Sequence, residues 1–148
     1  MKTTQTSYTS TLSSRHRTRK FLFIFSQSDN WWLKTLGGYT HVSLMEQIDD
    51  ETYIYIDPMT YGSETSIIKL SSPFPIIDGL TILKVTIKSN KRVNKLVRLG
   101  FQSCSTIVQY MAGIWLGAWT AHGLYRSLTE LNLASLHKHG IIEVVKHG

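Results

Sequence analysis

The spacing of hydrophobic residues changes along the chain, and each spacing predicts a different element. Residues 21–25 form a continuous apolar run of strand length, which predicts a central strand buried on both faces. Alternating apolar and polar residues at 39–47 and 51–57 predict two strands that pair as a hairpin. The alternation returns at 80–88 and predicts a further strand. Between them, 59–79 is rich in Gly, Ser and Pro and is predicted to be a long loop with one short strand.

Helical spacing dominates the second half of the chain. Apolar residues between 103 and 114 recur at the period of a helix, with Cys104 on the face that points toward the sheet. A second helix is predicted at 121–128, and residues 141–145 are predicted to be extended. In the first half, a short helix is predicted at 31–36, between an Asp-Asn cap and a Gly-Gly stop.

These elements fit one domain. A chain of 148 residues is long enough to bury its own hydrophobic core. Residues 1–20 are rich in Thr, Ser and Arg and are predicted to be a flexible basic tail. Residues 21–130 are predicted to form a single α+β domain, in which an antiparallel sheet packs against the cysteine-bearing helix. Residues 131–148 are predicted to be a C-terminal tail.

The chain carries a formal net charge of +6, which favours an acidic partner such as nucleic acid or a wall polymer. Clusters of basic residues are more typical of solvated loops, however, and no nucleic-acid-binding motif accompanies them. The clusters are Arg15, Arg17, Arg19 and Lys20 near the N-terminus, and Lys84, Lys88, Lys91, Arg92, Lys95 and Arg98 before the cysteine.

The single cysteine and the lengths of the apolar runs indicate in which kind of compartment the protein is expected. Cys104 is the one cysteine, which excludes an intrachain disulfide and a cysteine-rich zinc or iron–sulfur site. The first twenty residues contain no apolar stretch, so no signal peptide is expected. The apolar runs at 21–25 and 107–119 are too short to span a bilayer. We expect a protein of a reducing compartment or a virion interior, without a membrane span.

The polar face of the predicted hairpin carries His41 and Asp57. If the turn is centred on Asp49, the two residues are directly opposed, with their Cβ atoms about 4.5–5.5 Å apart. A carboxylate at that distance orients an imidazole and raises its pKa. The prediction depends on the register, because a slip of one residue would move a side chain to the other face.

Cys104 lies at the predicted start of its helix, where unpaired N–H groups and the helix dipole favour a thiolate. Together with His41 and Asp57 it supplies the parts of a cysteine hydrolase. Cys104 would be the nucleophile, His41 would hold and return its proton, and Asp57 would orient the imidazole. Backbone N–H groups at the helix start would stabilise the oxyanion, with Gln102 as an additional amide donor.

Each of these residues also has a structural interpretation. A single cysteine on an apolar helix face is commonly a core residue, and a His–Asp pair between strands can be a simple structural hydrogen bond. Ser43 shares the polar face of the hairpin, but nothing near it in the sequence supports a nucleophile. No carboxylate cluster completes a metal site around the C-terminal histidines, so we expect neither metal nor cofactor. Those histidines are His122, His137, His139 and His147.

Several motifs follow one another in a fixed order. They are a front strand, Trp31-Trp32, a strand that begins at His41, the strand Tyr53-Ile54-Tyr55-Ile56-Asp57-Pro58, a Ser103-Cys104 helix and a closing helix at 120–125. This order, over about residues 21–128, resembles a group of small, mostly uncharacterised phage and prophage proteins. The resemblance implies a circularly permuted papain-like cysteine hydrolase, in which histidine precedes cysteine. It implies Cys104 and His41 as the catalytic pair and Asp57 as the third member.

Two functions follow from this resemblance. The first is a papain-like cysteine peptidase or amidase that hydrolyses an amide bond in a protein or in peptidoglycan. The second is a non-enzymatic virion or accessory protein, which uses the fold as an assembly module with other phage structural proteins. Either function places the protein in a virion or in the host cytoplasm. The fold alone does not select between them.

Overall fold

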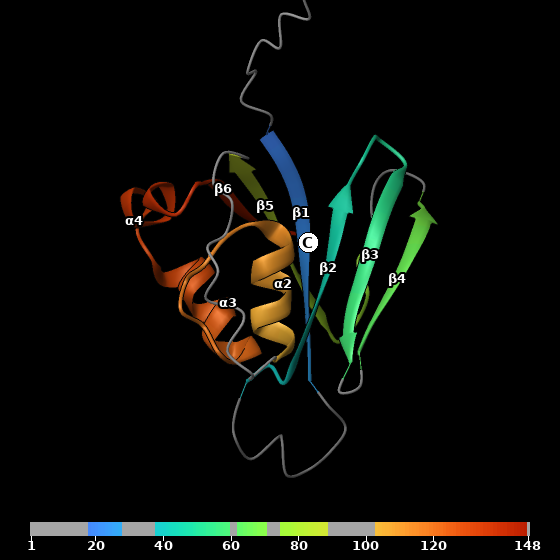
Figure 1. Cartoon of the computed structure of the whole chain (residues 1–148), viewed down its shortest axis with the longest axis horizontal. Coiled ribbons are helices and arrows are strands. Elements are labelled where there is room, and N and C mark those ends of the chain that lie inside the picture. The colour runs from blue at the N-terminus through green and yellow to red at the C-terminus, as the bar shows by residue number, and fades with distance from the viewer. Residues whose placement is uncertain (1–17, 28–37, 60–61, 71–74, 89–102, 148) are drawn as a thin grey trace, which may run out of the picture.

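The computed structural model describes residues 18–27, 38–59, 62–70, 75–88 and 103–147. These residues form a six-stranded sheet in the order β4-β3-β2-β1-β5-β6, in which all neighbouring strands are antiparallel (Figure 1). The expected α+β class is therefore confirmed. The strands are β1 (Thr18–Ser26), β2 (His41–Gln47), β3 (Thr52–Met59), β4 (Gly62–Lys69), β5 (Leu80–Lys88) and β6 (Ile141–His147).

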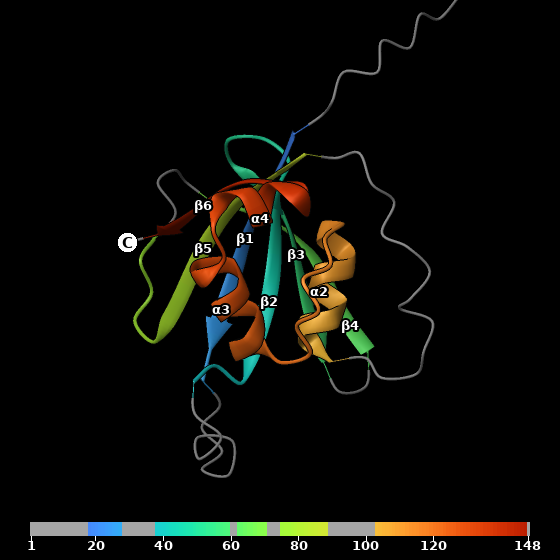
Figure 2. The ribbon, with the colours of Figure 1, turned by 90° about the vertical axis from the view of Figure 1, so that its left-hand side faces the viewer.

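Helices cover one face of this sheet (Figure 2). They are α2 (Cys104–Ala112), α3 (Ala121–Glu130) and α4 (Leu133–Lys138). Each begins at a polar N-cap whose side chain accepts a backbone N–H of the first turn, the caps being Ser103, Thr120 and Asn132. α2 ends at Gly113, which adopts the left-handed conformation with φ 75°.

β1 lies in the middle of the sheet and is buried on both faces, as predicted. Phe21, Phe23 and Phe25 are at most 1% exposed and pack in the core beneath the helices. Leu22 and Ile24 point to the other face and form a second, smaller core. An uninterrupted apolar run is what a strand covered on both faces requires.

The hairpin of β2 and β3 has a register that differs by two residues from the predicted one. Leu44 pairs with Ile56, and the ladder stops there although both strands continue. If the ladder were extended, His41 would lie opposite Met59, so the prediction that His41 directly opposes Asp57 is wrong. A shift of two residues keeps every side chain on its face. His41 and Asp57 therefore still share one face as diagonal neighbours.

The hydrogen bonds of the turn explain this register. Asp49 Oδ1 accepts the N–H groups of Glu51 and Thr52, at 3.0 and 2.7 Å. The N–H of Ile48 donates to the carbonyl of Thr52 at 2.9 Å. The turn is consequently centred on Asp50 rather than on Asp49.

Two segments of the sheet differ from the sequence prediction. The segment 59–79, predicted as a long loop with one short strand at 66–70, contains β4, a longer strand at the edge of the sheet. Most of its residues are exposed, so the strand lacks the alternation that would have marked it. The second strand of the hairpin, predicted at 51–57, extends to Met59 and includes Pro58, at a position where the ladder with β2 has already stopped.

Residues 131–147 of the predicted C-terminal tail belong to the fold instead. It contains α4 and the strand β6, which pairs with β5 from Ile82–His147 to Ile87–Ile141. Ile141 is fully buried in the main core. The predicted helix 31–36, residues 1–17 of the basic tail and the basic segment 89–102 lie outside the described residues. No helix within the described part of the chain is long and apolar enough to cross a membrane.

Gly38 offers a test of how the chain enters β2. It adopts φ +77°, and a Cβ at this position would overlap the ring of His122. We expect Gly38→Ala to lower the free energy of unfolding by about 2–4 kcal/mol, through backbone strain and overpacking together. Gly79 has φ +80° with nothing within 4 Å of a Cβ. Gly79→Ala should therefore lower the free energy of unfolding by the backbone strain alone. Urea unfolding of both variants measures the difference, and equal losses would contradict the overlap.

Candidate active site

Cys104 occupies the first position of α2 and packs half-buried against the main core. A capping box fixes this end of the helix. Ser103 Oγ accepts the N–H of Thr106 at 3.2 Å, and Thr106 Oγ1 accepts the N–H of Ser103 at 2.9 Å. The cysteine is thus held at a rigid helix N-terminus.

His41 and Asp57 meet at the end of the sheet where β2 begins and β3 leaves its ladder. His41 Nε2 lies 2.6 Å from Asp57 Oδ1, and the two side chains are 37% and 20% exposed. A diagonal pair of residues is within reach of an imidazole and a carboxylate. His41 and Asp57 therefore make the predicted contact, but as diagonal neighbours on the two strands and not as directly opposed residues.

Cys104 joins this pair because α2 packs on β2 and β3 where the two strands diverge (Figure 1). Its thiol is in hydrogen-bond contact with His41. The sulfur also accepts the backbone N–H groups of Val42 and Ser105. Val42 lies in the part of β2 that the β3 ladder no longer includes. The three predicted residues, Cys104, His41 and Asp57, are thus brought together.

The pKa values of His41 and Cys104 are shifted in opposite directions. The pKa of His41 is raised from 6.5 to about 9 by its hydrogen bond to Cys104, against the effect of burial and with the help of Asp57. For Cys104, burial acts to raise the pKa, but the hydrogen bonds from His41 and from the Val42 N–H outweigh it, so the pKa is lowered. Between the two pKa values the thiolate and imidazolium forms coexist.

The first turn of α2 also supplies a donor for an oxyanion. The N–H of Ser105 contacts the sulfur, that of Thr106 donates to Ser103 Oγ, and that of Ile107 donates to the carbonyl of Ser103 at 3.0 Å. The N–H of Cys104 is the first-turn donor to which these bonds assign no acceptor. Gln102, the second predicted donor, lies outside the described residues.

Buried polar side chains of α2 fix the chain that passes beside the cysteine. Ser105 Oγ and Gln109 Nε2 both donate to the carbonyl of Ala118, at 2.8 and 2.6 Å, and both residues are fully buried. Ser103 Oγ donates to the carbonyl of Trp119 at 2.7 Å. Ser103 and Ser105, the two sequence neighbours of Cys104, thus both bind this segment. Gln109 was not predicted to support the site, although a polar residue on an apolar helix face is a recognisable signal.

Tyr55 was also missed as part of the site. Its hydroxyl is in hydrogen-bond contact with Ser43 and with Asp57. Ser43, which shares the polar face with His41, is 4% exposed, and its side chain is hydrogen-bonded to Tyr55. The period of two along a strand places Tyr55 on the same face as Asp57, but it does not reveal the contacts of the tyrosine hydroxyl.

The C-terminal histidines do not form a metal centre among the described residues, where no cluster of three candidate ligands occurs. His122 packs against Tyr39 and Tyr125, and its Nδ1 is buried without a hydrogen-bond partner. His137 Nε2 lies 3.0 Å from the carbonyl of Ile142. Both rings therefore have structural roles.

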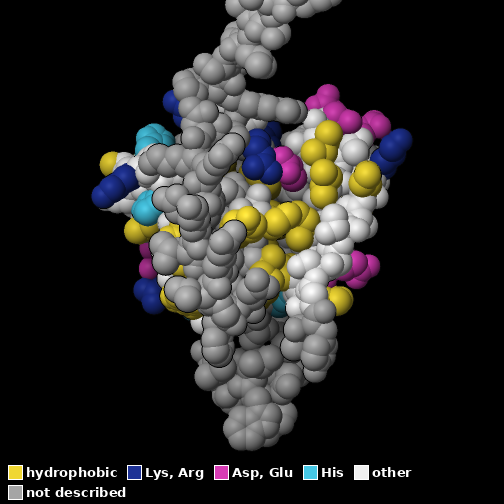
Figure 3. All heavy atoms as spheres, viewed as in Figure 1, with side chains coloured by type: hydrophobic (Ala, Val, Ile, Leu, Met, Phe, Trp, Pro, Cys, Tyr) yellow, Lys and Arg dark blue, Asp and Glu magenta, His cyan; other side chains and the backbone are white. Residues whose placement is uncertain are grey.

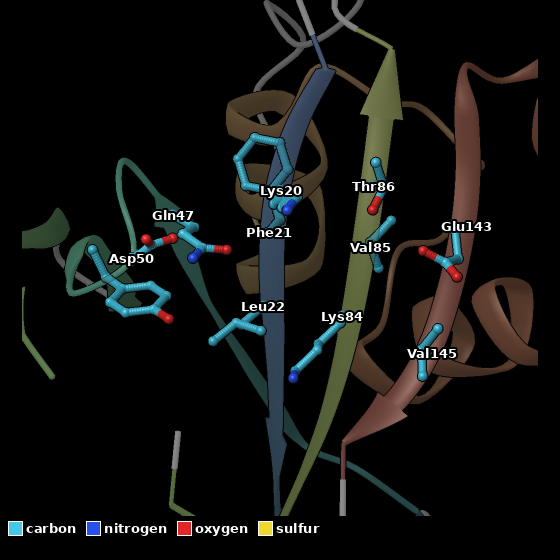
Figure 4. A pocket seen from close by; sticks show the side chains of 11 residues that line it. Lys20, Phe21, Leu22, Gln47, Asp50, Lys84, Val85, Thr86, Glu143 and Val145 are labelled. Carbon is cyan, nitrogen blue, oxygen red and sulfur yellow. The ribbon is translucent and has the colours of Figure 1, made fainter. Parts of the chain in front are cut away.

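A cavity of about 520 Å³ opens on the face of the sheet opposite the helices (Figure 4). Lys20 and Leu22 of β1, Tyr53 of β3 and Lys84 of β5 contribute to its lining. None of the catalytic candidates lines it. The cavity is therefore separate from the thiol.

Comparison of the chain with protein families, with curated proteins and with solved structures finds no match. Assignment of a function rests on the geometry of the site.

The ionic pair predicts a specific titration. In the wild type, His41 should lose its proton near pH 9, because the thiolate stabilises the imidazolium. In Cys104→Ala the largest raising contribution is gone, so the midpoint should move down toward 6.5. NMR of the imidazole Cε1–H, assigned with His41→Ala, measures both values. A His41 midpoint that is the same in wild type and Cys104→Ala would contradict the pair.

Proposed function

We propose that the protein is a thiol hydrolase that cleaves an amide bond, with Cys104, His41 and Asp57 as its catalytic residues. The observation that carries the proposal is the contact of all three at a helix N-terminus, with the thiol pKa lowered and the imidazole pKa raised. A pKa arrangement of this kind is typical of a functional site. Isolated core cysteines have raised pKa values instead.

Acylation follows from the geometry. The Cys104 thiolate attacks the carbonyl carbon of the amide, and the negative charge moves to the carbonyl oxygen, which the N–H of Cys104 can stabilise. The C–N bond then breaks as His41 donates its proton to the leaving nitrogen. The products of this step are a free amine and a thioester on Cys104. Because Asp57 holds Nε2, Nδ1 is the ring nitrogen left for this proton.

Deacylation uses the same groups in reverse. Neutral His41 accepts a proton from water, and the hydroxide attacks the thioester carbon. The C–S bond breaks, which releases a carboxylic acid and restores the thiolate beside the imidazolium. Asp57 remains charged and orients the ring through both steps. No cofactor is required.

The arrangement that we propose is a circularly permuted papain-like one. The chain order histidine, aspartate, cysteine supports it, as does a cysteine helix packed on an antiparallel sheet. We propose a protein or peptidoglycan as the source of the amide bond and a virion or the host cytoplasm as the location. The net charge of +6 would favour docking on an acidic polymer.

The second candidate function is an assembly module, and exposed apolar side chains favour it. Ile67 on β4 is 74% exposed, and Ile76 in the connection to β5 is 73% exposed. Hydrophobic side chains also gather around α2 on the face in Figure 3. Surfaces of this kind are common at protein interfaces.

Alkylation of Cys104 by iodoacetamide separates the two functions, because the chain has a single thiol. Followed by intact mass from pH 4 to pH 10, the wild type should show an apparent pKa below the ordinary value, and His41→Ala should raise it. Lowering the thiol pKa by one gives about tenfold more thiolate at low pH. Cys104→Ala should also abolish hydrolysis of amide substrates without unfolding the protein.

His139→Ala is the matched control, because it removes an exposed histidine far along the chain from the pair. It should alkylate like the wild type. A thiol that reacts only on unfolding, or with the same pH profile in wild type and His41→Ala, would contradict the hydrolase and favour the assembly module.

A further inference from the structure

We propose that Tyr55 is a positioning residue, which holds the Asp57 carboxylate against His41 through its hydroxyl and is itself held by Ser43. The proposal rests on the proposed function, because it concerns the geometry of the same catalytic pair. It assigns a role to a residue on β3 that does not touch the thiol.

The placement of Tyr55 follows from the register. Tyr55 pairs with Met45 across the β2–β3 ladder, so its side chain lies on the same face as Ser43 and Asp57. It is half-buried and packs against the smaller core. Its hydroxyl contacts Ser43 on one side and Asp57 on the other. The tyrosine therefore links β2 to the catalytic carboxylate.

This link crosses the point at which the two strands separate. The β2–β3 ladder ends at Leu44 and Ile56, so backbone pairing with β2 no longer fixes the position of Asp57. Asp57 still pairs with Glu64 of β4, which places a like charge directly opposite it. A donor from Tyr55 offsets that repulsion. The side-chain bond thus replaces the missing ladder at the residue where precise placement matters.

The direction of the hydrogen bonds is consistent with this role. Ser43 donates to the phenol oxygen, and the phenol O–H donates to Asp57, which also accepts from His41. Burial raises the pKa of Tyr55 from its ordinary value of 10.0, and Asp57 and Glu64 add to the shift. Tyr55 therefore keeps its proton over the whole range in which His41 is charged.

Tyr55→Phe tests the proposal, because it removes the hydroxyl and keeps the ring. We expect the apparent pKa of Cys104 alkylation to rise and the rate near pH 6 to fall about three- to tenfold, since a loosely held Asp57 orients His41 less well. The NMR midpoint of His41 should fall as well. Tyr53→Phe is the matched control, since Tyr53 lies on the same face of β3, two residues farther from Asp57 than Tyr55. It should leave the alkylation profile and the His41 titration unchanged.

A double substitution decides whether Tyr55 acts through Asp57. In an Asp57→Ala background, Tyr55→Phe should cause no further shift of the alkylation profile, and a further shift of full size would overturn the proposal. If Tyr55→Phe does not fold, Ser43→Ala provides the second variant. It should shift the profile in the same direction by a smaller amount, and an unchanged profile would overturn the proposal.

The outcomes separate this inference from the function on which it rests. If wild type and His41→Ala differ as expected while Tyr55→Phe alkylates like wild type, the hydrolase stands and the role of Tyr55 is wrong. If the wild-type thiol has an ordinary pKa, the proposed function itself fails.

Discussion

The early end of the β2–β3 ladder is the constraint on which the site depends. Pairing stops at Leu44 and Ile56, while both strands run on and separate. The gap lets the N-terminus of α2 approach the edge of β2, where the Val42 N–H donates to the cysteine sulfur. A continuous ladder would occupy that N–H with a strand neighbour. The loss of backbone pairing is thus what allows a helix residue and two strand residues to share one site.

A second constraint comes from buried polar groups in α2. Polar side chains without partners are costly in a core, so fully buried Ser105 and Gln109 require the carbonyl groups that they contact. They bind the segment between α2 and α3 in one position, and Thr120 then caps α3. The helix that carries Cys104 is therefore fixed from two sides, by the sheet and by the chain that follows it. A rigid support of this kind suits a thiol whose pKa depends on its contacts with His41 and Val42.

Much of the fold follows from local patterns in the sequence. The buried run of β1, the faces of the hairpin and the start of α2 at Cys104 were all predictable, because each depends on spacing or capping within a few residues. The register was not, because the Asp49 side chain decides the centre of the turn. β4 was predicted only as a short strand within a loop, because the first half of this edge strand is exposed and shows no alternation. Tyr55 and Gln109 were missed as site residues because part of their contacts lie outside their own element, with Ser43 on β2 and with the carbonyl of Ala118 after α2. No local pattern in the sequence encodes such contacts.

The opposed shifts of Cys104 and His41 have a consequence for folding. The raised pKa of His41 gives stability that is complete below pH 6.5 and is lost as the pH rises to about 9. The lowered pKa of Cys104 gives stability that is complete above its ordinary value of 9.0 and is lost as the pH falls. Where these two pH ranges overlap the slopes cancel, since folding only moves one proton from sulfur to nitrogen. The pair therefore exchanges no net proton with solvent on folding in that overlap, and the fold carries its charged centre without becoming sensitive to pH there.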